Sequence, residues 1–305
     1  MAKDLHLRFF LDPSLRASAE AGRHNFIGKL SNVLRQSGFE IDYCGDDEAA
    51  LDLARQDDGA FAMFHMRAPI GPRALVFRRV YHYPFWAIEP QAERWHWHVA
   101  RTPFRPEEID PEEAARFVRF WRKKLFARPL PAPEGEGFLY IPLQGRLTEH
   151  RSFQSCAPVE MIARVLALDP RPVIATLHPR EIYTPEDHAA LDALVARHPR
   201  LTVPTGGMDR LFPACDAVIT ENSSVAFNGF LLGKPAMIFA DIDFHHIALD
   251  AREDAAAAFA ALGNHRPDYE RYLYWFWQVM AIKAGRAEAE GGIRAALTRA
   301  GWPVT

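Results

Sequence analysis

Short apolar runs alternate with amphipathic stretches along the first half of the chain. Residues 5–12, 40–45 and 60–66 are apolar runs with the length of buried strands. The stretches between them, 26–39 and 48–56, repeat apolar residues at the spacing of a helix. Strands and helices in this order form crossover units, and they predict a parallel sheet.

The same alternation returns in the second half. A strongly periodic helix at 111–126, opened by Asp110 and Pro111, ends the first half. Strand-like and helix-like runs then follow one another to residue 241. The strands are expected at 138–144, 172–178, 201–205, 216–221 and 235–241, and the helices at 158–168, 185–198, 208–215 and 223–233.

A segment rich in proline and glycine, 128–137, separates the two halves and reads as a linker. It predicts an N-terminal α/β domain at 1–127 and a second α/β domain at 138–268. The remaining residues, 269–305, are expected to form helices that return to the N-terminal domain, with a break near Gly291-Gly292. The predicted fold class is therefore α/β, with two parallel-sheet domains facing each other across a cleft.

Composition and charge narrow the classes of protein without naming one. The chain has 305 residues, which at roughly 150 per domain suits about two domains. Hydrophobic residues make up 49% and charged residues 25%, as in globular proteins, and the net charge of −3 disfavours general nucleic-acid binding. The longest apolar run, Tyr272–Met280, is shorter than the ~20 residues that span a bilayer.

The N-terminus and the cysteines indicate a cytoplasmic protein. No long apolar core followed by a small-residue cleavage site opens the chain, so no signal peptide is expected. Cys44, Cys156 and Cys215 are far apart and odd in number, which suits reduced thiols better than a disulfide framework.

Polar side chains follow the strands of the second half. Gln144 and Arg146 come directly after the first of these strands, and His178, Pro179 and Arg180 come after the second. In open parallel sheets, ligands bind beyond the carboxyl ends of the strands. An imidazole beside a guanidinium can hold a phosphate, although a histidine in such a place can also be purely structural.

A fourth strand is followed by Asn222, Ser223 and Ser224, where a helix is expected to begin. The free N–H groups and the dipole at a helix N-terminus attract a phosphate or a carboxylate. The same residues are also the preferred helix caps when no ligand is present. Asn228 lies more than one turn further along this helix.

The motifs PLQ, LHPRE, ITENSS and LLGKP, in this order across residues 138–247, resemble the capsule polysaccharide biosynthesis glycosyltransferases. That family includes the bacterial β-Kdo transferases and, more distantly, resembles the bacterial sialyltransferases. The resemblance implies a GT-B fold of two Rossmann-like domains. It also implies that His178 and Pro179, together with Ser223 and Ser224, hold the cytidine monophosphate part of a CMP-sugar donor.

The chain departs from the family pattern at three points. Asn228 stands where many GT-B donor domains have an acidic residue that holds the ribose. Thr176 and Leu177 precede the His-Pro pair, where the family often has lysine. The chain is also short for a GT-B enzyme, which implies a trimmed acceptor domain.

A catalytic base is expected at the strand ends of the first half, because a hydroxyl acceptor must lose its proton. Asp12 follows the first strand and His65 ends the third, and these two are the predicted catalytic residues. Both can instead be turn or cap residues. His24 and Asn25 precede the first long helix, where GT-B proteins often contact the acceptor.

The sequence thus predicts a glycosyltransferase of cell-surface polysaccharide synthesis that uses a nucleotide-activated sugar, with a CMP-linked donor favoured. Its partners are a nucleotide sugar and a saccharide acceptor, and it needs no cofactor and no metal. Peripheral membrane association and contact with polysaccharide-assembly proteins stay open. So do two other functions: a non-catalytic binding or assembly protein of GT-B-like fold, and a UDP-sugar epimerase.

Overall fold

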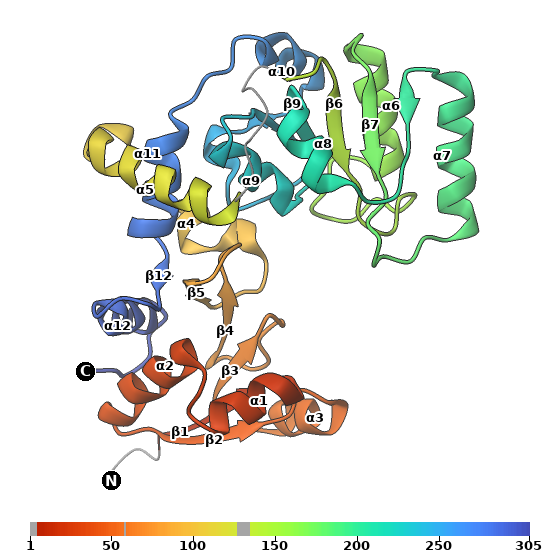
Figure 1. Cartoon of the computed structure of the whole chain (residues 1–305). Coiled ribbons are helices and arrows are strands. Elements are labelled where there is room, and N and C mark those ends of the chain that lie inside the picture. The colour runs from red at the N-terminus through yellow and green to blue at the C-terminus, as the bar shows by residue number, and fades with distance from the viewer. Residues whose placement is uncertain (1–4, 58, 127–134) are drawn as a thin grey trace. The chain divides into compact units, whose positions relative to one another are not determined.

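The computed structural model describes residues 5–57, 59–126 and 135–305. The chain forms two compact units. Unit 1 ends at Thr102 and resumes at Trp275, and unit 2 comprises Pro103–Tyr274. Each unit is built on a six-stranded sheet (Figure 1). Most of the predicted linker at 128–137 lies outside the described residues.

Unit 1 contains a sheet in the order β12-β5-β4-β3-β1-β2. Strands β2, β1, β3 and β4 are parallel, whereas β5 and β12 are antiparallel to their neighbours. The strands are β1 (His6–Phe10), β2 (Glu40–Cys44), β3 (Phe61–His65), β4 (Ala74–Arg79), β5 (Phe85–Glu89) and β12 (Ile282–Lys283), and the main helices are α1 (Pro13–Glu20), α2 (Asn25–Gln36), α3 (Glu48–Gln56), α4 (His98–Arg101) and α12 (Ala289–Arg299).

Apolar side chains cover both faces of this sheet. On one face, Phe26 and Leu30 of α2 share a core with Ile293 and Leu297 of α12, and all four are fully buried. On the other face, Leu51 of α3 packs with the short core around β1 and β3. The last residues of the chain, from Trp275, therefore complete unit 1.

Unit 2 contains a parallel sheet in the order β11-β10-β9-β6-β7-β8. Its helices alternate with the strands, as in a Rossmann-like domain. The strands are β6 (Leu139–Pro142), β7 (Val173–Thr176), β8 (Leu201–Thr202), β9 (Ala217–Thr220), β10 (Ala236–Ile238) and β11 (Leu249–Asp250), and the helices are α5 (Pro111–Leu125), α6 (Pro158–Leu168), α7 (Pro185–Arg197), α8 (Met208–Ala214), α9 (Ser224–Leu231), α10 (Ala255–Leu262) and α11 (Tyr269–Tyr274).

The two sheets confirm the predicted α/β class with two Rossmann-like parallel-sheet domains. Helix α5, which the sequence assigns to the N-terminal domain, packs instead on α11 within unit 2. The Arg271 guanidinium donates to the carbonyl of Ile109, and the Tyr274 hydroxyl donates to the Glu113 carboxylate. These side-chain contacts between distant segments leave no periodic trace in the sequence.

Four features of unit 1 differ from the sequence pattern. Helix α1 and strands β4 and β5 were not expected, because α1 has little apolar periodicity and the strands lie among aromatic and basic residues. The expected break near Gly291-Gly292 is wrong, since α12 runs through both glycines. A Cβ at Gly292 would lie 3.5 Å from Ile282, which is an ordinary packing distance, so α12 packs on β12 at this point.

Helix α5 begins at a side-chain cap, because the Asp110 carboxylate accepts the backbone N–H of Glu113 at 2.8 Å. We expect Asp110→Ala to lower the free energy of unfolding by about 1 kcal/mol, the usual effect of losing an N-cap. Urea unfolding measures this change, and Asp110→Asn, which keeps a cap acceptor, should restore most of it. An unchanged midpoint in the alanine variant would show that the cap contributes nothing.

Candidate functional site

The strand order of unit 1 creates a switch point beside β1. The chain passes from β1 to β2 on one side and then returns to place β3 on the other side. Loops leaving the carboxyl ends of β1 and β3 therefore diverge, and ligands of open α/β sheets bind in the crevice that forms there. Asp12 follows β1 and His65 is the last residue of β3, so both lie at this point.

Asp12 and His65 face each other at the switch point. The Nδ1 atom of His65 lies 3.8 Å from Oδ2 of Asp12, which is within ion-pair range but longer than a hydrogen bond. The other oxygen, Oδ1, accepts the backbone N–H groups of Ser14 and Leu15 and caps α1. Asp12 is therefore both a helix cap and a charge held against the imidazole.

The surroundings of His65 keep its imidazole neutral. Burial lowers the pKa of His65 below its ordinary value of 6.5, and the Asp12 carboxylate opposes that shift. The ring lies beside Phe77 and Trp86, at centroid distances of 5.2 and 6.3 Å. A neutral imidazole that is partly exposed and next to a carboxylate can accept a proton at neutral pH.

His24 belongs to the same cluster. Its Nδ1 accepts the N–H of Ile27 and caps α2, which leaves the proton on Nε2. The ring stands edge-on to Trp86 at 5.5 Å, and burial lowers the pKa of His24. Asn25 donates to the carbonyl of Ala284 at 3.1 Å, so this amide ties α2 to the C-terminal segment.

Unit 2 has a second switch point, beside β6. Strand β7 lies on one side of β6 and β9 on the other. A small pocket opens there, between the loop that leaves β6 and the loop that leaves β9. Gln144 from the first loop and Asn222 from the second both line it. Two of the predicted donor-binding residues are thus brought together from positions far apart in the sequence.

The serine motif forms the start of α9. Ser223 is buried and caps the helix, because its hydroxyl accepts the N–H of Val225 at 3.3 Å and its own N–H donates to Thr220. Ser224 is exposed and begins the helix. The capping alternative is therefore realised at Ser223, while the Ser224 hydroxyl is accessible to a ligand. Asn228 is half-buried within α9.

The His-Pro loop follows β7 and is held by its own contacts. The backbone N–H of His178 donates to the Tyr183 hydroxyl at 2.7 Å, and Nδ1 of His178 accepts the N–H of Arg180. The proton of a neutral His178 is then on Nε2, which is left to donate. Pro179 and the Arg180 side chain are exposed.

The loop after β6 approaches this loop closely. A Cβ at Gly145 would lie 3.0 Å from the Glu181 carboxylate, so only glycine permits the approach without a shift. Arg146 has a φ of 64° and pairs with Glu149 at 3.4 Å. Gly145 thus lies against residues 181 and 182, while the neighbouring Gln144 shares the small pocket with Asn222.

Glu221 is a site residue to which the sequence assigned no role. It is 7% exposed, lines the pocket between β6 and β9, and accepts a hydrogen bond from Gln154. Arg151 lies 3.6 Å away, and burial raises the pKa of Glu221 to about 7. An acidic residue that ends an apolar strand was the only available signal, since Arg151 and Gln154 lie in an irregular segment.

The described residues contain no group of three or more His, Cys, Asp or Glu side chains that could hold a metal ion. His96 and His98, which alternate in the sequence, lie in short helical turns. Within the same described ranges, no helix has both the length and the apolar character needed to cross a membrane.

The sequence matches no protein-family profile and no curated protein. Two solved structures align with most of the chain. The β-Kdo 2,7 transferase of Thermosulfurimonas dismutans KpsC aligns over 96% of this chain and 99% of its own, with 14% identity and a TM-score of 0.52. The β-Kdo 2,4 transferase of the same protein aligns over 88% and 89%, with 14% identity and a TM-score of 0.46. The first alignment shows a GT-B-like fold shared over nearly the whole of both chains.

Proposed function

We propose that this protein is a glycosyltransferase that uses a CMP-linked sugar as its nucleotide-activated donor in the assembly of a cell-surface polysaccharide. One observation supports the proposal: Asp12 and His65 lie at the switch point of one sheet, and Gln144 and Asn222 lie at that of the other, where open α/β sheets bind ligands. The fold shared with a β-Kdo transferase is consistent with it.

In this proposal, unit 2 binds the donor. His178 donates from Nε2, Arg180 supplies the positive charge, and the backbone N–H groups at the start of α9 donate to the phosphate together with the Ser224 hydroxyl. These donors would stabilise the negative charge that develops on the departing nucleotide. Gln144 and Asn222 would contact the same ligand from the pocket between β6 and β9.

Unit 1 supplies the base. His65 would remove the proton from the acceptor hydroxyl, and Asp12 would stabilise the imidazolium that forms. This division of roles assigns a catalytic task to the cluster in unit 1 where the Asp12 carboxylate lies beside the His65 imidazole at a strand end.

A thermal-shift screen with CMP, UMP, UDP, GDP and free sugars tests the donor site. We expect CMP to stabilise the wild type: at about 100 times Kd the gain is about 2.7 kcal/mol, or roughly 5–10 °C in Tm for a unit of this size. The His178→Ala variant should lose most of the CMP-dependent shift, because it loses the Nε2 donor.

His198→Ala is the matched control, since His198 ends α7 and precedes the amino end of β8, whereas His178 follows the carboxyl end of β7 in the same sheet. Its Tm should still rise with CMP. Silence of the wild type with every nucleotide would refute the donor site and favour a non-catalytic binding or assembly protein. If CMP does bind, slow hydrolysis of a CMP-sugar by the wild type would show that the protein is an enzyme and not a binding subunit.

A further inference from the structure

Unit 1 has a pocket of about 410 Å³ that the proposed function does not use. Leu5, Phe61 and Ala74 line it, and these residues lie at or just before the amino ends of β1, β3 and β4. Asp12 and His65 lie at the carboxyl ends of the same parallel strands. The pocket is therefore at the opposite edge of the sheet from the proposed base.

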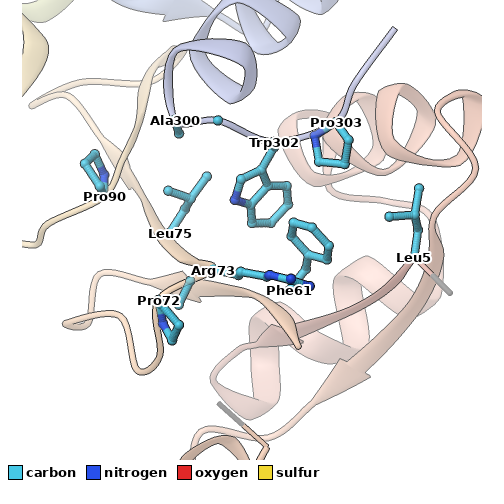
Figure 2. Close-up of a pocket in the computed structure, with 11 residues that line it drawn as sticks. Leu5, Phe61, Pro72, Arg73, Leu75, Pro90, Ala300, Trp302 and Pro303 are labelled. Carbon is cyan, nitrogen blue, oxygen red and sulfur yellow. The ribbon is translucent and has the colours of Figure 1, made fainter. Parts of the chain in front are cut away.

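The C-terminal segment forms one wall of this pocket (Figure 2). Gly301 has a φ of 79° and ends α12, so the chain turns and Trp302 packs against the sheet. The Trp302 ring lies edge-on to Phe61 at 5.0 Å and stacks on Phe39 at 5.8 Å. These contacts hold the indole rigidly in place inside the pocket.

The polar side chains of the pocket, Arg73 and Trp302, are hydrogen-bond donors. The Arg73 guanidinium lies over the Phe61 ring at 5.2 Å and has no ion pair or hydrogen bond among the described residues. Figure 2 shows the indole nitrogen of Trp302 on the side of the pocket near Leu75. None of the eleven lining residues is acidic.

Three carbonyls near the end of α12 are already hydrogen-bonded within the chain. The carbonyls of Ala296, Leu297 and Thr298 already accept the N–H groups of Ala300, Trp302 and Gly301. The remaining walls are apolar and come from Leu5, Pro72, Leu75, Pro90 and Pro303. A cavity of this volume lies in the range of small-molecule binding sites.

We propose that this pocket binds a small monocarboxylate with an apolar body. The planar guanidinium of Arg73 matches a carboxylate and balances one negative charge, whereas a phosphate monoester carries nearly two. The Trp302 indole N–H supplies a second donor. The apolar body packs on the leucine and proline side chains.

Titration of ¹⁵N-labelled protein with hexanoate tests the site by the indole N–H resonance of Trp302, which is identified by its loss in Trp302→Phe. We expect a saturable shift with hexanoate. Acetate lacks the apolar body, hexanol lacks the charge, and hexylamine carries a charge of the opposite sign. Each of the three should bind at least about tenfold more weakly than hexanoate. Arg73→Gln should weaken hexanoate about tenfold, the loss of one charge-assisted pair.

Arg35→Gln is the control, because Arg35 is also exposed but lies on α2 outside the pocket. It should bind hexanoate as the wild type does, and so should His178→Ala. Arg73 is exposed, so its replacement leaves the core intact even if Trp302→Phe destabilises the unit. The proposal is overturned if hexanoate gives no saturable shift, if hexanol or hexylamine equals it, or if Arg73→Gln binds as tightly as the wild type.

Discussion

We expect the His65→Gln variant to transfer sugar about 100 to 10,000 times more slowly than the wild type, which is the usual contribution of a positioned general base. Glutamine keeps a polar side chain at the end of β3 but cannot accept the acceptor's proton. Donor binding should be unchanged, because His65 lies in unit 1 and the proposed donor residues lie in unit 2. Initial rates and CMP-dependent thermal shifts measure the two effects separately.

The pH dependence identifies the base more sharply. His65 must be neutral to act, so kcat/KM should rise with pH through the pKa of His65, which burial lowers below 6.5. Asp12 opposes that shift, so Asp12→Asn should move the rise to still lower pH while reducing the rate. His6→Gln is the control, since His6 also pairs with an aspartate, Asp42, but at the exposed amino end of β1. An unaltered rate in His65→Gln would exclude it as the base.

Glu89→Gln should stabilise the protein at alkaline pH and change little at acidic pH. Glu89 ends β5, is 4% exposed and accepts the N–H of His98 at 3.1 Å. Burial raises the pKa of Glu89 from 4.5 to about 7. The folded state therefore binds the Glu89 proton more tightly than the unfolded state does. The resulting contribution to the stability of the fold is fully present below pH 4.5 and is lost as the pH rises through about 7.

A difference between 4.5 and about 7 corresponds to about 3 kcal/mol as an upper value. Glutamine removes the ionisation but keeps an acceptor for His98, so we expect a gain of about 1–3 kcal/mol at pH 8. Urea unfolding at pH 5 and pH 8 measures it. Glu40→Gln, at an exposed residue of β2, should show no such gain. Equal stability of wild type and Glu89→Gln at pH 8 would contradict the buried charge.

The candidate donor site was largely predictable because its residues follow strands with clear apolar patterns. His178 comes after β7 and Ser223 caps α9, as the residue types at those boundaries indicate. Helices α3 and α6 begin and end where the periodicity does. Arg151 and Gln154 could not be found in this way, because they reach Glu221 through side-chain contacts from an irregular segment.

Local sequence by itself determined most of the parallel strands, most helices and the polar residues at their ends, since apolar periodicity and capping act over a few residues. Only the tertiary structure decided which of these ends meet. Asp12 lies beside His65 because β3 pairs with β1 on the side opposite β2. Gln144 lies near Asn222 because β9 pairs with β6 on the side opposite β7. Strand order depends on how helices pack across whole sheet faces. Those contacts join segments far apart in the sequence, so no single segment predicts them.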